Sequence, residues 1–283
     1  MKKGLILGTC LLLLTACSSS GYSVEVSDSK QNIVSGDITL SKQEYFEYLL
    51  DSYGADEVIT QIYNAIADKE LTDQDEIDKL VKERQDLYAS YSDGNLKEYV
   101  KSIGYDSVKA YTNDVILPSI KQELLRKKYI KENLESLLTE HQVVSIKQII
   151  VEKESDALTI IKASTNEKSF DNQMKAFSDN AEDLGIVTKS TTLDEKILDV
   201  LGTLAKTEKD GVYGEAIQLS DGTYAVVFIY DTERKKQDDY INALDSDYEV
   251  QEEIQKKYFE KYHFQVNDDL LEKAINNVYS DLD

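Results

Sequence analysis

Hydrophobic side chains between residues 40 and 140 recur mainly at the i, i+3, i+4 and i+7 spacing of amphipathic helices. The clearest stripes are Ile59, Ile62, Tyr63 and Ile66, followed by Ile77, Leu80, Val81, Leu87 and Tyr88. Ser41, the stretch 72–75 and Asn95 precede such stripes and are typical helix N-caps. Pro118, the only proline, predicts a helix start or a kink inside the long segment 107–138.

The pattern changes at His141. Residues 143–151 are rich in β-branched side chains and predict a strand, which Ser145, Lys147 and Gln148 interrupt. These interruptions predict that one edge or face of the strand is polar. The chain then predicts two short helices, a strand, a third helix and a hairpin, at residues 157–163, 170–177, 184–187, 193–204 and 216–230. Asp221-Gly222 between β-rich runs marks the hairpin turn.

After Asp231 the spacing returns to that of helices, through Tyr240 to Tyr262 and again from Leu270 to Val278. The sequence therefore predicts an α+β protein. Its helical domain is built from N- and C-terminal segments, with an inserted α+β domain that has a small antiparallel-rich sheet and flanking helices. The expected boundaries are 1–16, 17–34, 35–140, 141–232 and 233–283.

The first residues predict export and a lipid anchor. Lys2 and Lys3 precede an apolar run, residues 5–14, that is too short to span a bilayer. It ends in Leu14-Thr15-Ala16-Cys17, which resembles the bacterial lipobox. We expect residues 1–16 to be a signal peptide and Cys17 to carry lipid. The alternative is a plain signal peptide with an incidental cysteine. Residues 17–34 have the composition of a flexible tether.

Cysteine content and charge limit the function classes. The only cysteines are Cys10 and Cys17, so the domain after the signal peptide has no free thiol and no disulfide. The formal charge is −22, and −24 after loss of the two basic residues in 1–16. Nucleic-acid binding and adsorption to anionic lipid are disfavoured. The acidic surface supports solubility, or attracts basic segments of unfolded proteins.

Four stretches together resemble the PrsA-type foldase lipoproteins of Gram-positive bacteria, relatives of the SurA-like chaperones. Residues 35–46 (SGDITLSKQEYF) are similar to the family's opening "NG-x-x-I-T-x-x-E-F-Y". Residues 183–185, 211–214 and 222–227 resemble the parvulin "GGDLG", "GEVSGPV" and "GYHIIKV" stretches in order. The resemblance implies a helical chaperone domain with an inserted parvulin-like prolyl isomerase domain, and it allows a homodimer.

The departures from the parvulin pattern concern the isomerase pocket. The first strand's histidine is replaced by Gln148 and the hairpin's histidine by Tyr224. The acidic or cysteine position aligns with Asn180, or with Asp179 if the register slips, while Leu184 is kept. The Met and Phe of the pocket helix fall near Leu193 and Ile197. Gln148 and Tyr224 do not titrate near neutral pH as histidine does, so the degenerate pocket predicts weak or absent isomerase activity.

Other chemistries have little support. His141 and His263 lie far apart, and no His, Cys and carboxylate set has metal-ligand spacing, so we expect no catalytic residue, metal or cofactor. No G-x-S-x-G elbow is present. Nineteen tyrosines, many on the helical segments, would suit sequence-tolerant binding of unfolded chains, or are ordinary core and rim residues.

The sequence therefore predicts a lipid-anchored chaperone or foldase on the extracytoplasmic face of the cell membrane. Its expected partners are unfolded, newly translocated secreted proteins and, through the lipid, the membrane. An active prolyl isomerase is the first alternative. The second is a surface adhesin or solute-binding lipoprotein, although two α/β lobes would be typical of a solute binder.

Overall fold

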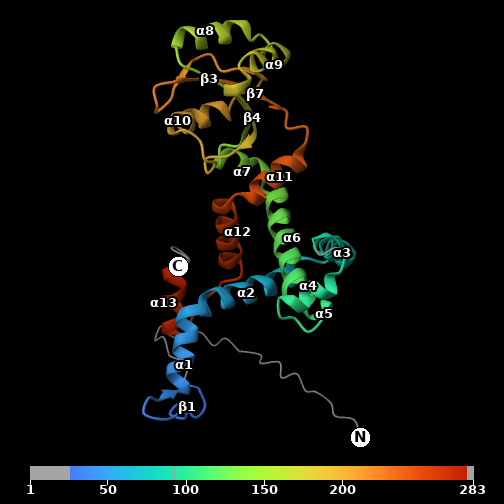
Figure 1. The fold of residues 1–283 in the computed structure, drawn as a ribbon, viewed down its shortest axis with the longest axis vertical. Coiled ribbons are helices and arrows are strands. Elements are labelled where there is room, and N and C mark those ends of the chain that lie inside the picture. The colour runs from blue at the N-terminus through green and yellow to red at the C-terminus, as the bar shows by residue number, and fades with distance from the viewer. Residues whose placement is uncertain (1–25, 92–93, 279–283) are drawn as a thin grey trace. The chain divides into compact units, whose positions relative to one another are not determined.

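A computed structural model describes residues 26–91 and 94–278 of the chain (Figure 1). The chain divides into two compact units: residues up to 60 together with residues from 264 onward, and residues 61–263. Helix α2 (Ala55–Glu70) runs from the first unit into the second. The two compact units divide the chain after residues 60 and 263. The expected boundaries after residues 34, 140 and 232 lie elsewhere and stay predictions.

The first unit is built around a hairpin and one helix. Its elements are β1 (Asn32–Val34), β2 (Leu40–Ser41), α1 (Lys42–Leu49), the π-helical turn η1 (Leu50–Gly54), the start of α2, and α13 (Asp269–Val278). β1 and β2 pair antiparallel, and α13 packs on η1. Ser41 caps α1 as predicted. Ser41 Oγ accepts from the Glu44 N–H at 3.2 Å, and the Glu44 carboxylate accepts from the Ser41 N–H at 2.7 Å.

Helices from both flanks pack together in the second unit. They are α3 (Gln74–Ser90), α4 (Leu96–Ser102), α5 (Val108–Tyr111), the π-helical turn η2 (Thr112–Ile116), α6 (Leu117–Glu132), α7 (Leu134–Glu140), α11 (Gln237–Ser246) and α12 (Tyr248–Lys261). α6 contacts both α11 and α12. Arg126 on α6 donates to Asp245 on α11 at 2.7 Å. The ring centroids of Tyr63 on α2 and Tyr258 on α12 lie 6.2 Å apart. The two flanks thus share one core, as expected.

Pro118 lies inside a continuous run of helical backbone formed by α5, η2 and α6. It lies in the first turn of α6, directly after η2. Proline has no N–H to donate to the preceding turn, and its ring crowds the carbonyl four residues earlier. A π-helical turn at that point changes the hydrogen-bond pattern and accommodates the ring.

The α/β module follows the predicted order of strand, helices, strand, helix and hairpin. Its elements are β3 (Val144–Val151), α8 (Glu154–Ala163), α9 (Glu167–Ala176), the 3₁₀ turn η3 (Ser178–Asn180), β4 (Ala181–Val187), α10 (Glu195–Leu204), β5 (Gly211–Val212), β6 (Ile217–Gln218) and β7 (Tyr224–Tyr230). The antiparallel sheet has the order β4-β3-β7-β5, with β6 also paired to β7. The predicted α+β class is confirmed.

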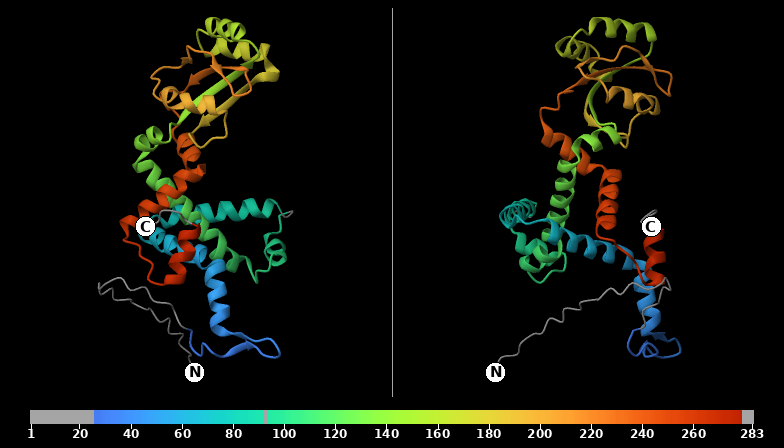
Figure 2. Two further views of the ribbon diagram at one scale, coloured as in Figure 1. Left: turned by 90° about the vertical axis from the view of Figure 1, so that its left-hand side faces the viewer. Right: turned by 180° about the vertical axis from the view of Figure 1, so that it is seen from behind.

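Each face of the sheet is covered by its own helices (Figures 1 and 2). α8 and α9 cover one face through a cluster that includes Ile149, Phe170 and Phe228. α10 covers the other face, where Ile146 and Leu201 are buried together. Alternate residues of β3 therefore point to different helical layers.

Of the two alternatives, a polar edge or a polar face on the first strand of the module, the polar edge is wrong. β3 lies between β4 and β7, so both of its edges are paired. Ser145 is 2% exposed and its hydroxyl is hydrogen-bonded to the Tyr240 hydroxyl at 2.8 Å. Lys147 is 8% exposed and donates to Glu167 and Asp171, each at 2.8 Å. Partners from other elements satisfy these groups, which the strand's own sequence does not reveal.

Candidate functional site

The four predicted pocket positions lie on three strands and one turn of the module. Gln148 is central on β3, Leu184 is on β4, Tyr224 begins β7, and Asn180 ends η3. Gln148 pairs with Glu182 on one side and with Val227 on the other. Asn180 is exposed, and its N–H donates to the Phe177 carbonyl at 2.8 Å.

The sheet register separates Gln148 from Tyr224. Gln148 lies opposite Val227, which belongs to the cluster beneath α10, and Leu184 packs against that same cluster. Tyr224 lies opposite Val151, and both pack in the cluster beneath α8 and α9. The structure thus brings Gln148 and Leu184 to one face and places Tyr224 on the other. Their assignment to one isomerase pocket stays a prediction.

The face that carries Gln148 is closed by α10. Ile197 on this helix is 2% exposed, and Leu193, just before the helix, packs against the same cluster. The two positions expected to line a proline slot therefore contribute to the core. Gln148 Oε1 is buried, and no described residue forms a hydrogen bond with it. An amide in that position cannot reproduce a pair of titrating imidazoles.

No histidine lies between residues 142 and 262, so the whole module lacks one. His141 is 1% exposed at the end of α7, and its Nε2 lies 2.8 Å from Glu253 on α12. The residue therefore joins α7 to the C-terminal helices. Neither histidine of the chain belongs to the sheet.

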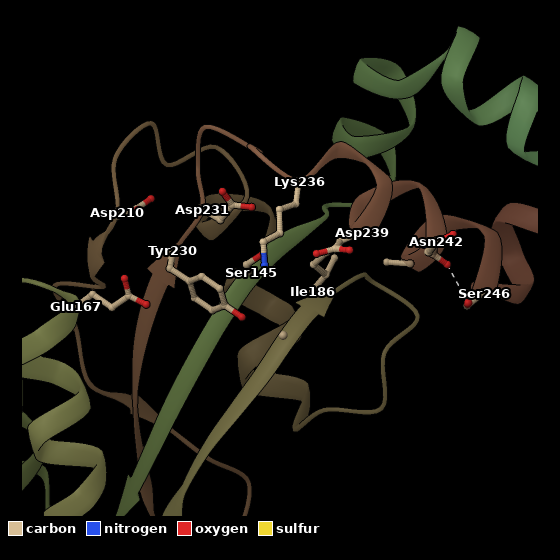
Figure 3. Close-up of a pocket in the computed structure, with 12 residues that line it drawn as sticks. Ser145, Glu167, Ile186, Asp210, Tyr230, Asp231, Lys236, Asp239, Asn242 and Ser246 are labelled. Carbon is tan, nitrogen blue, oxygen red and sulfur yellow. Dashed lines mark hydrogen bonds between the residues drawn. The ribbon is translucent and has the colours of Figure 1, made fainter.

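A pocket of about 680 Å³ opens between the sheet and α11 (Figure 3). Its lining is Ser145, Glu167, Gly185, Ile186, Asp210, Tyr230, Asp231, Lys236, Asp239, Asn242, Ala243 and Ser246. Figure 3 shows Lys236 extending from the start of α11 toward Ser145, with the ring of Tyr230 below it. No motif marked this pocket, because its residues come from separate strands, loops and a helix.

Electrostatics at the pocket favour cations over anions. Four carboxylates line it, against the single ammonium group of Lys236. Burial raises the pKa of the Tyr230 phenol, and the hydrogen bond that Tyr230 donates to Asp183 at 2.8 Å raises it further. Burial acts to raise the pKa of Asp210. The pKa is nevertheless lowered, because the Thr232 N–H and hydroxyl donate hydrogen bonds to the Asp210 carboxylate. Asp210 therefore stays ionised.

No histidine or cysteine is among the residues that line the pocket. Its polar groups are carboxylates, hydroxyls, one amide and one lysine. Across residues 26–91 and 94–278, no group of His, Cys, Asp and Glu side chains could hold a metal ion. Nearby, burial opposes the charge of Lys147, but hydrogen bonds to Asp171 and Glu167 raise its pKa. Lys147 is therefore committed to internal ion pairs.

Large exposed apolar side chains lie mostly outside the module. Among the described residues they are Ile33, Val34, Ile38, Tyr45, Tyr48, Tyr53, Leu87, Tyr91, Ile103, Leu158, Tyr248 and Leu270. Only Leu158 belongs to the module. Leu87 and Tyr91 lie at the end of α3, and Ile103 ends the neighbouring α4; we call these three the α3–α4 patch.

Tyrosine rings pack between the helices that carry the α3–α4 patch. Tyr88, Tyr99 and Tyr105 surround the buried Tyr111, with ring centroids 5.0 to 6.2 Å from it. Burial, followed by the neighbouring tyrosines, raises the pKa of Tyr111 to about 12. These rings form a core, which is the ordinary role that the tyrosine count left open.

The predicted lipid attachment residue, Cys17, lies outside the described residues. In the described part of the chain, no helix is both long and apolar enough to cross a membrane.

Comparisons by sequence find no matching family model and no matching curated protein. Solved structures do match. The peptidylprolyl isomerase PrsA from Bacillus cereus is 14% identical, with 88% of this chain and 99% of that chain covered and a TM-score of 0.45. PrsA from Bacillus subtilis is 18% identical over the same shares, with a TM-score of 0.41. The foldase protein PrsA from Streptococcus pneumoniae is 14% identical over the same shares, with a TM-score of 0.39.

Proposed function

We propose that this chain is a lipid-anchored extracytoplasmic chaperone that assists the folding of secreted proteins after translocation. Its parvulin-like module has weak or no prolyl isomerase activity. The signal-peptide pattern and the lipobox-like stretch at Cys17 support the lipid anchor. The exposed apolar side chains of the described residues support the chaperone role.

The α3–α4 patch is the observation that carries the chaperone role. Leu87 and Tyr91 are four residues apart and share one side of α3, and neighbouring exposed apolar side chains mark interaction surfaces on soluble proteins. Leu87, Tyr91 and Ile103 are 45%, 73% and 45% exposed on neighbouring helices. Such a surface suits unfolded segments, which present apolar side chains without a fixed sequence. Tyrosine adds contact area at a low cost in side-chain entropy.

The weak isomerase activity rests on the missing histidines and on the sheet register. Prolyl isomerisation needs a slot for the proline ring and a field that favours the twisted amide, whose barrier is about 18–20 kcal/mol. The module contains no histidine, and Gln148 and Tyr224 lie on opposite faces of the sheet. The apolar face that carries Gln148 is covered by α10.

Two assays on one sample of residues 17–283 test the proposal. The first follows cis/trans isomerisation of a short Xaa-Pro peptide, with an active parvulin as positive control. The second follows the aggregation of an unfolded client protein. We expect suppressed aggregation without an increase in the isomerisation rate. Failure to suppress aggregation at stoichiometric concentration would contradict the chaperone role.

Replacing the α3–α4 patch locates the client surface. The Leu87→Ser/Tyr91→Ser/Ile103→Ser variant should lose most of the aggregation suppression. Leu158→Ser is the matched control, because Leu158 is 40% exposed but lies on α8 in the module. Equal loss in the two variants would show that any apolar surface suffices. Circular dichroism checks that both variants are folded.

The active isomerase is the alternative that the same peptide assay decides. Leu184 retains a pocket residue of the resembled family, and Gln148 Oε1 has no hydrogen-bond partner among the described residues. A rate increase comparable to that of the control parvulin, abolished by Gln148→Ala, would put this function first. An adhesin or solute-binding lipoprotein would show neither activity.

A further inference from the structure

The arm formed by residues 26–54 exposes apolar side chains along its whole length. Ile33 and Val34 on the hairpin are 46% and 51% exposed, and Ile38 at the hairpin turn is 82% exposed. On the helix that follows, Tyr45 and Tyr48 share one side, and Tyr53 continues the exposed series on η1. α1 has no buried residue, so nothing in the described chain covers this surface.

The distance from Cys17 to the arm is short. Val26 already belongs to the arm, because its N–H donates to the Gln43 side chain on α1 at 3.2 Å. The Lys42 N–H donates to the Gln31 carbonyl at 2.8 Å and ties the next residues to the helix. Only residues 18–25 separate Cys17 from Val26. Even a fully extended chain of that length spans at most about 30 Å.

We propose that the hairpin and α1 dock on the lipid surface that holds Cys17. This inference rests on the proposed lipid anchor. A lipidated Cys17 would keep Ile38 and Tyr48 within reach of the headgroup layer at all times, so the effective concentration of lipid at the arm is high. Isoleucine and valine side chains enter the boundary between headgroups and acyl chains, and tyrosine favours the headgroup level.

The charge of the arm defines which lipid surface it prefers. Residues 26–54 carry five carboxylates and two lysines. Anionic headgroups would repel this surface, while zwitterionic headgroups would not. Contact therefore depends on the apolar and aromatic side chains, and docking weakens as the anionic fraction of the bilayer rises. Basic peripheral proteins show the opposite dependence.

Single tryptophan variants can test the docking directly, because the chain has no tryptophan and residues 17–283 have one cysteine. Cys17 is coupled to a maleimide lipid in phosphatidylcholine vesicles, with or without bromine on the acyl chains. Ile38→Trp and Tyr48→Trp report on the arm. Tyr91→Trp is the control, because Tyr91 is a similarly exposed aromatic residue in the other unit.

On coupling, we expect Ile38→Trp and Tyr48→Trp to shift their emission to shorter wavelength and to be quenched at least two-fold by brominated lipid. Tyr91→Trp should change in neither respect. Adding Ile38→Asp to the Tyr48→Trp variant, or replacing half of the lipid by an anionic one, should reduce the quenching. Circular dichroism checks the folding of each variant.

Three outcomes would overturn the proposal. The arm variants could keep the emission of the uncoupled protein, or Tyr91→Trp could be quenched equally. Emission could also shift with protein concentration in the absence of vesicles, which would assign the surface to a second copy of the chain. Because Cys17 is coupled chemically to the lipid, these experiments test the docking of the arm and do not test whether the cell acylates Cys17. Mass spectrometry of Cys17 in protein extracted from the membrane judges the lipid anchor separately.

Discussion

Glu70 joins three helices through a single carboxylate. It accepts from Lys128 on α6 at 2.6 Å, from Tyr262 after α12 at 2.9 Å, and from Lys261 on α12. Its side chain is only 10% exposed. The hydrogen bonds from Lys128 and Lys261 outweigh burial and lower the pKa of Glu70 to about 2. Such a bridge between sequence-distant helices depends on the ionised form.

Glu70→Gln should therefore destabilise the fold in a pH-dependent way. We expect a loss of about 1–2 kcal/mol in the free energy of unfolding at pH 7, the scale of hydrogen bonds to charged groups. The pKa of Glu70 is lower in the folded state, so its contribution is complete above pH about 4.5 and disappears as the pH falls toward 2. Urea unfolding at several pH values measures this.

The difference between the native chain and Glu70→Gln should shrink steadily below pH 4.5. Glu83→Gln is the control, since Glu83 is 58% exposed and lies 3.8 Å from Lys79. A constant difference from pH 7 to pH 3 would show that the ionised carboxylate is not what stabilises the helices.

Restoring histidines should not restore an isomerase. In Gln148→His/Tyr224→His, the two imidazoles would project from opposite faces of the sheet, because Gln148 lies opposite Val227 and Tyr224 opposite Val151. The proline-peptide assay should give the rate of the native chain. Substantial acceleration by the double variant, but by neither single one, would mean that the register differs from the one described above.

Among the elements, α9 fixes one layer of the module to the sheet. Phe170 is fully buried, and its ring lies 5.1 Å from that of Phe228 on β7. The capping box at Asn166 starts the helix one turn earlier: Asn166 accepts from the Ser169 N–H, and the Ser169 hydroxyl accepts from the Asn166 N–H. Local capping and core packing thus place this helix together.

Phe170→Ala should cost about 3–5 kcal/mol, the range for removing a buried aromatic side chain and leaving a cavity. Urea unfolding followed by circular dichroism measures the loss. Lys168→Ala on the same helix is the control and should change stability by less than about 0.5 kcal/mol, because Lys168 is exposed. Similar losses in the two variants would indicate that helix propensity, rather than packing on Phe228, is being measured.

For the whole molecule, the module enters and leaves the helical part at neighbouring points. Ser145 near the start of β3 is paired with Tyr230 at the end of β7. Paired strands lie about 5 Å apart, so a short linker can join the two ends. α6, α11 and α12 hold the flanks together through contacts that do not involve the sheet, such as Arg126 with Asp245.

Replacing residues 144–230 by a short Gly/Ser linker should leave a folded helical protein. It should retain helical circular dichroism and most of the aggregation suppression, because the α3–α4 patch is intact. Its melting temperature should fall, since Tyr240 loses the Ser145 hydroxyl and keeps only its hydrogen bond to the Asp231 carbonyl. Loss of helical structure would show that the flanks depend on the module.

Local sequence determined the elements of this protein. Helical stripes, N-caps such as Ser41 and Asn95, and the Asp221-Gly222 turn act over a few residues, so they predict helices and the hairpin without knowledge of the fold. The α+β class followed from the order of these elements, and the absence of histidine between residues 142 and 262 is a property of the sequence itself.

Tertiary structure decided what depends on residues far apart in the chain. It buried Ser145 and Lys147 by supplying Tyr240, Glu167 and Asp171 as partners. It set the register that separates Gln148 from Tyr224, because a shift of one residue reverses the face of every side chain on a strand. It also left the hairpin uncovered. Burial and register are properties of packed neighbours, which no local pattern contains.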